Sequence, residues 1–168
     1  REVKIGKLIA GIVDDGDCIQ LGIGSIPNAV AAALTDKKDL GVHTEMFTTG
    51  IMNLMKAGVV TGRYKQVHRE KAVCSFMIGS REMYDFVDDN PAVLVLDCNY
   101  VNAPGIIARN DNQVSINTSL EVDITGQCCS ESLGSRQFSG TGGQTDTAVG
   151  AQLSRNGTSI IAISSSAM

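Results

Sequence analysis

Three segments of the chain carry residues whose types and spacing could support chemistry. The first, Gly22 to Asn28 (GIGSIPN), lies between a predicted strand and a predicted helix. Glycines let backbone N–H groups approach a ligand, and a helix N-terminus favours negative charge. The loop lacks the third glycine of a dinucleotide fingerprint and the Gly-Lys-Ser/Thr of a P-loop. It therefore indicates either a structural turn or an anion site of another kind.

The second segment is His43-Thr44-Glu45, at the end of the next predicted strand. A carboxylate at a strand end can be a nucleophile, a general base or a solvated surface group, and the local pattern leaves all three open. His-x-Glu also occurs in zinc deaminases, but their Pro-Cys-x-x-Cys partner is missing here. We discard the zinc interpretation, and nothing else in the sequence asks for a metal.

The third segment is Ser139 to Asp146 (SGTGGQTD), with three glycines in four residues. Such a run makes either a backbone nest for anions or a plain surface loop. Ser130 to Ser132 (SES), just before it, has no histidine nearby in the sequence and suggests no catalytic role. Asn110 to Asn112 (NDN) predicts a turn, because no glutamate follows at calcium-loop spacing.

The elements that must position these segments follow from hydrophobic periodicity. It predicts helices over 3–13, 28–34, 51–57 and 81–87, and strands over 18–21, 40–44, 71–78, 92–96 and 159–163. Residues 114–124 are predicted to be extended and to return as a hairpin through 127–130, before a polar, glycine-rich stretch over 134–150. Short alternation of strands and helices favours a parallel or mixed sheet covered by helices. No linker divides the chain, so we expect residues 1–168 to form a single domain.

Composition narrows the partners and the compartment. The 168 residues are 43% hydrophobic and 19% charged, with a net charge of −4 and only 4% aromatics. This profile predicts no nucleic-acid partner and, with no apolar run long enough, no membrane span. Five cysteines without a CxxC pair indicate reduced thiols and a cytoplasmic protein. Because the chain begins at Arg1, inside a helix-like pattern, we expect it to be a piece of a longer protein.

Taken together and in this order, the motifs resemble the acetyl-CoA hydrolase/transferase family, which includes 4-hydroxybutyrate and butyrate–acetate CoA-transferases. The resemblance covers nearly the whole chain through residues 22–30, 40–47, 84–91, 110–117, 126–127, 130–132 and 136–144. It implies a three-layer α/β/α fold with a mixed, mostly parallel sheet. It also implies that the chain is the first part of the C-terminal half of such an enzyme, without the N-terminal half and the extreme C-terminus.

The resemblance further implies a catalytic role for Glu45 and a substrate class. Glu45 would attack an acyl-CoA thioester and then carry CoA as a glutamyl-CoA thioester, which a short-chain carboxylate of the acetate, butyrate or 4-hydroxybutyrate type would resolve. Acyl-CoA is then a substrate, and no cofactor is permanently bound. The residues implied to supply donors and CoA contacts are Gly22, Ile23, Gly24, Ser25, Ile26, Leu120 and Gly143.

Two other functions stay open at this level: an acetyl-CoA hydrolase that uses the same intermediate, and a non-catalytic module that binds CoA. The family's second glycine loop reads Gly-Gly-Gln-x-Asp-Phe, whereas Thr147 stands here in place of phenylalanine. We expect this difference to loosen the packing behind the loop or to alter acyl specificity. We also expect the intact protein to be a homo-oligomer, and the isolated 168 residues to be poorly active without the other half.

Overall fold

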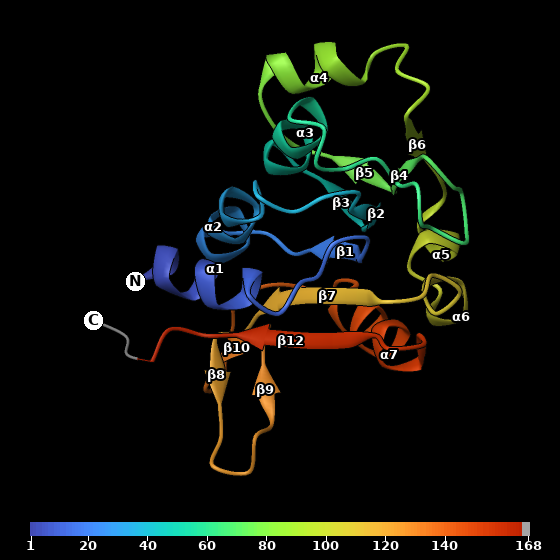
Figure 1. The fold of residues 1–168 in the computed structure, drawn as a ribbon. Helices are drawn as coiled ribbons and strands as arrows, with labels where there is room; N and C mark the ends of the chain where they lie inside the picture. Colours follow the sequence, from blue (N-terminus) through green and yellow to red (C-terminus); the bar gives the residue numbers. More distant parts are fainter. Residues whose placement is uncertain (166–168) are drawn as a thin grey trace.

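The structure, a computed structural model, describes residues 1–165 and is built on a six-stranded parallel sheet (Figure 1). Residues 166–168 of the predicted domain lie outside the described residues. The strands lie in the order β12 (Thr158–Ala162), β7 (Gln113–Thr118), β1 (Cys18–Leu21), β2 (Gly41–His43), β4 (Ala72–Cys74) and β6 (Val93–Val95). Each strand runs parallel to its neighbours, which requires a crossover connection between them.

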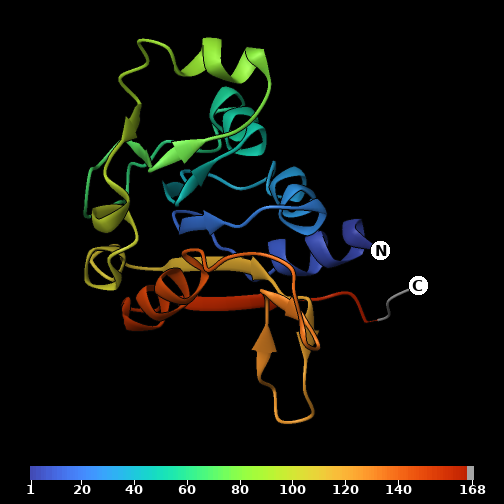
Figure 2. The same cartoon turned by 180° about the vertical axis from the view of Figure 1, so that it is seen from behind.

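Helices cover both faces of the sheet, as the two views from opposite sides show (Figures 1 and 2). One face carries α1 (Glu2–Ala10), α2 (Ser25–Ala33), α3 (Thr49–Lys56) and α4 (Arg81–Val87). The other face carries α5 (Cys98–Val101), α6 (Pro104–Ile107) and α7 (Gln144–Leu153). The chain crosses the sheet in one direction from β1 to β6 and returns to β7 and β12, so right-handed crossovers place the two helix groups on opposite faces. The predicted α/β/α class is confirmed.

Short two-stranded pairs lie outside the main sheet. β8 (Glu121–Val122) pairs with β9 (Cys128–Cys129), as predicted for the hairpin, and this ribbon projects from the bottom of the molecule in Figure 1. β10 (Ser132–Leu133) pairs with β11 (Arg136–Gln137), whereas β3 (Met46–Phe47) and β5 (Phe76–Met77) form a short parallel pair beyond β2 and β4. No described helix is both long and apolar enough to cross a membrane.

The strands bury chemically different side chains on their two faces. Ile19 and Ile116 belong to the apolar core that also contains α1, α2 and α3. Gln20 and Asn117, the next residues along β1 and β7, point to the opposite face and hydrogen-bond to each other. Asn117 also donates to Thr147 of α7 at 3.2 Å. Buried polar groups of this kind are tolerated because they satisfy one another.

Several helices differ from those predicted, and the polar face of the sheet explains the largest difference. The buried side of α7 consists of Thr147, Gly150 and Ala151, so the helix lacks an apolar stripe and was hidden in the stretch predicted as polar and glycine-rich. The four-residue helices α5 and α6 are too short to show a period. The predicted start of the second helix was also late, because Gly24 is the N-cap of α2.

Candidate functional site

A cavity of about 670 Å³ opens at the carboxyl edge of the parallel sheet. It is lined by Gly22 after β1, Glu45 after β2 and Asn117 at the end of β7. β1 is where the strand order reverses, since the chain leaves it toward β2 and later returns to β7 on its other side. Open α/β sheets bind ligands at such a switch point. The topology therefore places Glu45 where a ligand is expected.

The backbone at Glu45 is held on both sides. The Thr44 N–H donates to the Val73 carbonyl at 3.0 Å, and the Glu45 carbonyl accepts from the N–H groups of Ser75 and Phe76 at 2.8 and 3.2 Å. Thr44 is buried, whereas Glu45 is half-buried. The step from β2 to β3 thus turns the Glu45 side chain into the cavity from a fixed segment.

Each carboxylate oxygen of Glu45 has its own N–H donor. Asn102 Nδ2 lies 2.9 Å from Oε1, and the backbone N–H of Gly143 lies 3.4 Å from Oε2. Gly143 is the N-cap of α7, so its N–H belongs to the positive end of a ten-residue helix. Donors fixed beside a carboxylate are suited to stabilise negative charge that develops on its oxygens during acyl transfer.

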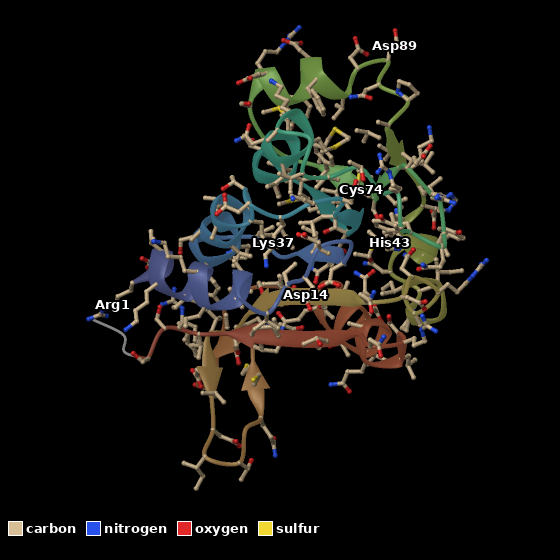
Figure 3. All side chains as sticks on the ribbon, in the orientation of Figure 1. Arg1, Asp14, Lys37, His43, Cys74 and Asp89 are labelled. Atoms are coloured by element: carbon tan, nitrogen blue, oxygen red, sulfur yellow. The ribbon has the colours of Figure 1, made fainter. Side chains whose placement is uncertain are left out.

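His43 fixes the position of the short helix α5, whose C-cap is Asn102. His43 Nε2 lies 2.9 Å from the carbonyl oxygen of Val101, the residue before Asn102, and His43 is labelled in Figure 3 where β2 approaches α5. Burial lowers the pKa of His43 to about 4, so at neutral pH the ring is uncharged and Nε2–H donates. His43 is therefore a structural donor and is unsuited to act as a base near neutrality.

Gly143 has to be glycine because three elements meet there. A Cβ atom at this position would lie 2.5 Å from Asn102 Nδ2 and 3.0 Å from Glu45 Oε2. The distance to Asn102 is shorter than real Cβ contacts, and the distance to Glu45 is tighter than most of them, so a side chain would displace the Asn102 amide and press on the carboxylate. The second glycine loop predicted from the sequence is thus where the backbone approaches Glu45.

Only part of the first glycine loop lies along the cavity. Gly22 and Ile23 line the cavity, but the Gly22 N–H already donates to the Ile116 carbonyl at 2.8 Å. Gly24 and Ser25 are exposed and lie outside the cavity lining, and the Ile26 side chain is buried in the core.

The turn at Gly24 leaves the start of α2 without a side-chain cap. Gly24 adopts φ +111°, a conformation that L-residues rarely reach, and as N-cap it offers no side chain to the first-turn N–H groups. Leu120 is half-buried, and its N–H donates to the Cys129 carbonyl at 3.0 Å, so it also lies apart from the cavity lining.

Several residues at the site were missed or dismissed by sequence reasoning. Asn102 lies 57 positions after Glu45, as the C-cap of a four-residue helix without a visible period, and no local pattern pointed to it. Cys98 Sγ lies 3.9 Å from Glu45 Oε1, and no local pattern indicated that this cysteine lies at the site. Ser130 to Ser132, given no catalytic role above, line the cavity, and Gln144 Nε2 donates to Ser130 Oγ at 2.7 Å. No cluster of three metal-ligating side chains occurs within residues 1–165.

Comparison with known protein families shows the family to which the chain belongs. The profile of the acetyl-CoA hydrolase/transferase C-terminal domain matches residues 79–168. The chain belongs to the acetyl-CoA hydrolase/transferase family. Asn102 and Gly143 lie within the matched segment, whereas Glu45 precedes it. The resemblance drawn from the motifs is confirmed.

Curated relatives extend the similarity over the whole chain. It is 49% identical to a 4-hydroxybutyrate coenzyme A transferase of Clostridium kluyveri, with 99% of this chain and 39% of the relative covered. It is 42% identical to a butyryl-CoA:acetate CoA-transferase of Anaerostipes caccae, covering 96% of this chain and 36% of the relative. An acetyl-CoA hydrolase of Candida albicans is more distant, at 32% identity over 92% of this chain and 28% of that protein.

Solved structures show the same fold. A 4-hydroxybutyrate CoA-transferase from Porphyromonas gingivalis superposes with a TM-score of 0.89 at 44% identity, over 99% of this chain and 39% of that one. RipA from Yersinia pestis gives a TM-score of 0.92 at 43% identity, over 99% of this chain and 37% of that one. The chain thus spans about two fifths of the length of these relatives.

Proposed function

We propose that this chain is the glutamate-bearing part of the C-terminal half of a longer CoA-transferase. The enzyme would move CoA between an acyl-CoA and a free short-chain carboxylate of the acetate, butyrate or 4-hydroxybutyrate type. The observation that carries the proposal is the Glu45 carboxylate, which faces the cavity while Asn102 and Gly143 donate to its two oxygens. The names of the more similar relatives support the reaction class.

The chemistry divides one exchange into two halves, each made of two acyl transfers. An oxygen of Glu45 attacks the thioester carbon of acyl-CoA, the C–S bond breaks, and a mixed anhydride and the CoA thiolate remain. The thiolate then attacks the glutamyl carbonyl carbon, the bond from that carbon to the bridging oxygen of the anhydride breaks, and the first acid leaves as its carboxylate with that oxygen. Glu45 now carries CoA as a thioester. The incoming carboxylate reverses both steps and departs as the new acyl-CoA.

The donors on this chain act when the glutamyl carbonyl becomes tetrahedral. At that moment negative charge concentrates on a Glu45 oxygen, and Asn102 Nδ2 already lies 2.9 Å from Oε1. Preorganised donors of this kind lower the barrier because they need no reorientation during the reaction. The N–H of Gly143, at the positive end of α7, serves the other oxygen.

CoA itself would contact the two glycine loops. Gly22, Ile23 and Gly143 line the cavity with Glu45 and are proposed to lie beside the thioester. The uncapped start of α2, at Gly24 with the exposed Ser25 and the following Ile26, offers backbone N–H groups to an anionic part of CoA. Leu120 would be a more peripheral backbone contact.

The rim of the cavity supports a role for the rest of the protein. Ile23, Phe76 and Ile78 are 64%, 43% and 65% exposed at its edge. Apolar side chains gathered at the mouth of a site are suited to be covered by another protein segment. The relatives are more than twice as long as this chain. We propose that their N-terminal half has a counterpart here, which closes the cavity and protects the thioester from water.

The proposal is tested by full-length enzyme assays with matched carboxylate variants. Acetyl-CoA is incubated with and without butyrate, and both butyryl-CoA and free CoA are measured. Butyryl-CoA formation that is lost in Glu45→Gln and kept in Glu82→Gln, an exposed carboxylate on α4, supports a transferase. Free CoA formed equally without butyrate would show a hydrolase, and CoA binding without turnover would show a binding module.

A further inference from the structure

We propose that Cys98 is a second acyl acceptor in this site, whose thiol takes the glutamyl group from CoA to form an internal Glu45–Cys98 thioester. The proposal rests on the proposed function, because it needs Glu45 in its activated form. It adds a covalent state to the reaction that does not contain CoA.

The geometry places the thiol against the reacting carboxylate. Cys98 Sγ lies 3.9 Å from Glu45 Oε1, and Asn102 Nδ2 lies within hydrogen-bonding distance of both, at 2.9 Å from Oε1 and 3.3 Å from Sγ. The Asn102 amide thus contacts both the Cys98 thiol and the Glu45 carboxylate and holds them side by side.

The position of Cys98 is fixed by its helix. It is the first residue of α5, whose N-cap Asp97 accepts a hydrogen bond from the Asn99 N–H at 2.8 Å. The other end of α5 is tied to β2 through His43 and the Val101 carbonyl. A nucleophile held this close to its target reacts as though it were present at very high concentration.

The other four cysteines do not share this contact. Cys18 and Cys74 are buried, and burial raises the pKa of each thiol to about 11, so they stay protonated. Cys128 Sγ lies 3.8 Å from the Gly126 carbonyl, and Cys129 Sγ lies 3.1 Å from Ser132 Oγ. Among the described residues, Cys98 is the thiol placed to reach Glu45.

The step balances without any further reagent. Cys98 Sγ attacks the glutamyl carbonyl carbon of the Glu45–CoA thioester, the bond from that carbon to the CoA sulfur breaks, and the thiol proton passes to the leaving CoA thiolate. One thioester is exchanged for another, so no oxidant, reductant or hydrolysis is involved. Free CoA reverses the step, which makes the internal thioester a resting form from which the activated glutamate is recovered.

The test compares the full-length protein with its Cys98→Ser variant after incubation with acetyl-CoA alone and removal of free CoA. The proposal predicts that the wild-type protein loses the mass of one water molecule and yields a hydroxylamine-sensitive cross-link between tryptic peptides 39–56 and 82–109. Cys98→Ser should instead retain CoA on Glu45, which also shows that its site is folded. Cys128→Ser should still form the cross-link.

Two other results would overturn the inference at different levels. If the wild-type protein and Cys98→Ser both hold CoA and neither forms the cross-link, the internal thioester is refuted while the glutamyl-CoA mechanism stands. If neither protein holds CoA or a cross-link although acyl-CoA is consumed, the proposed function itself falls and the inference with it.

Discussion

The hydrogen bond from Asn102 to Glu45 allows a role in catalysis to be separated from a role in packing. Asp is close to Asn in size and shape, but at neutral pH it presents a carboxylate where Asn102 presents an N–H donor. If Asn102 merely fills space, Asn102→Asp is the milder substitution and Asn102→Ala the harsher. If Asn102 stabilises the oxyanion on Glu45, the order reverses, because an acceptor facing that oxyanion is worse than an empty space.

The magnitudes follow from the 2.9 Å contact to Oε1. Removing one donor to a developing oxyanion costs about 2–4 kcal/mol, or roughly 30- to 800-fold in rate. The backbone N–H of Gly143 is at 3.4 Å and on the other oxygen, so it compensates poorly. In Asn102→Asp, like-charge repulsion adds between about 1 kcal/mol in water and about 4 kcal/mol at an effective dielectric of about 20, for charges roughly 4 Å apart. The half-buried site lies between these limits.

The assay is a rapid-quench measurement of CoA attachment to Glu45 in a single turnover at pH 7, made on the full-length protein. We expect the rates to fall in the order wild type, Asn102→Ala, Asn102→Asp. Asn99→Asp, an exposed change of the same charge in the same short helix, should keep the wild-type rate. An Asn102→Asp protein that reacts faster than Asn102→Ala would refute the oxyanion role.

Three further predictions concern the residues around this contact. Gly143→Ala should slow CoA attachment by roughly 30-fold or more, because its Cβ meets Asn102 and Glu45, whereas Gly142→Ala, with open space, should not; equal rates would contradict the close approach. The free energy of unfolding should fall by about 3 kcal/mol as the pH drops from about 6.5 to about 4, because the unfolded chain protonates His43 and the native state resists it. In denaturant titrations, the free energy of unfolding of His43→Gln should depend less on pH. The same pH dependence as in the wild-type protein would show that His43 is not its source. Thr147→Val should cost about 0.5–1.5 kcal/mol in the same titrations, since it removes one of the three acceptors around the buried Asn117 amide while Gln20 and Ser115 remain; an unchanged stability would contradict a stabilising role for this contact.

Much of the fold could be predicted because most elements carry a clear period or a clear boundary. The strand over 18–21 and the helix over 81–87 have the predicted bounds, since apolar runs between turn residues mark them. The polar face of the sheet could not be foreseen. Gln20 and Asn117 are stable in the interior because their partners come from other elements, and single-sequence patterns do not show such pairing.

The same reasoning explains which part of the site was visible. Glu45 and Gly143 belong to short motifs, and the structure brings them within hydrogen-bonding distance. Asn102 and Cys98 reach the site through a four-residue helix on the far face of the sheet, where only the tertiary fold gives them meaning. The sequence showed Thr147 only as a replacement for phenylalanine, whereas the structure shows a buried hydroxyl whose hydrogen bond to Asn117 joins α7 to the sheet.

Peptide mapping of the full-length protein, after incubation with acetyl-CoA and reduction with borohydride, shows directly whether Glu45 becomes a thioester. Borohydride reduces a thioester of the glutamyl group and leaves a free carboxylate untouched. A glutamyl-CoA mechanism predicts a reduced side chain at Glu45 in peptide 39–56, absent without acetyl-CoA. An unmodified Glu45 in a protein that still transfers CoA to butyrate would contradict it.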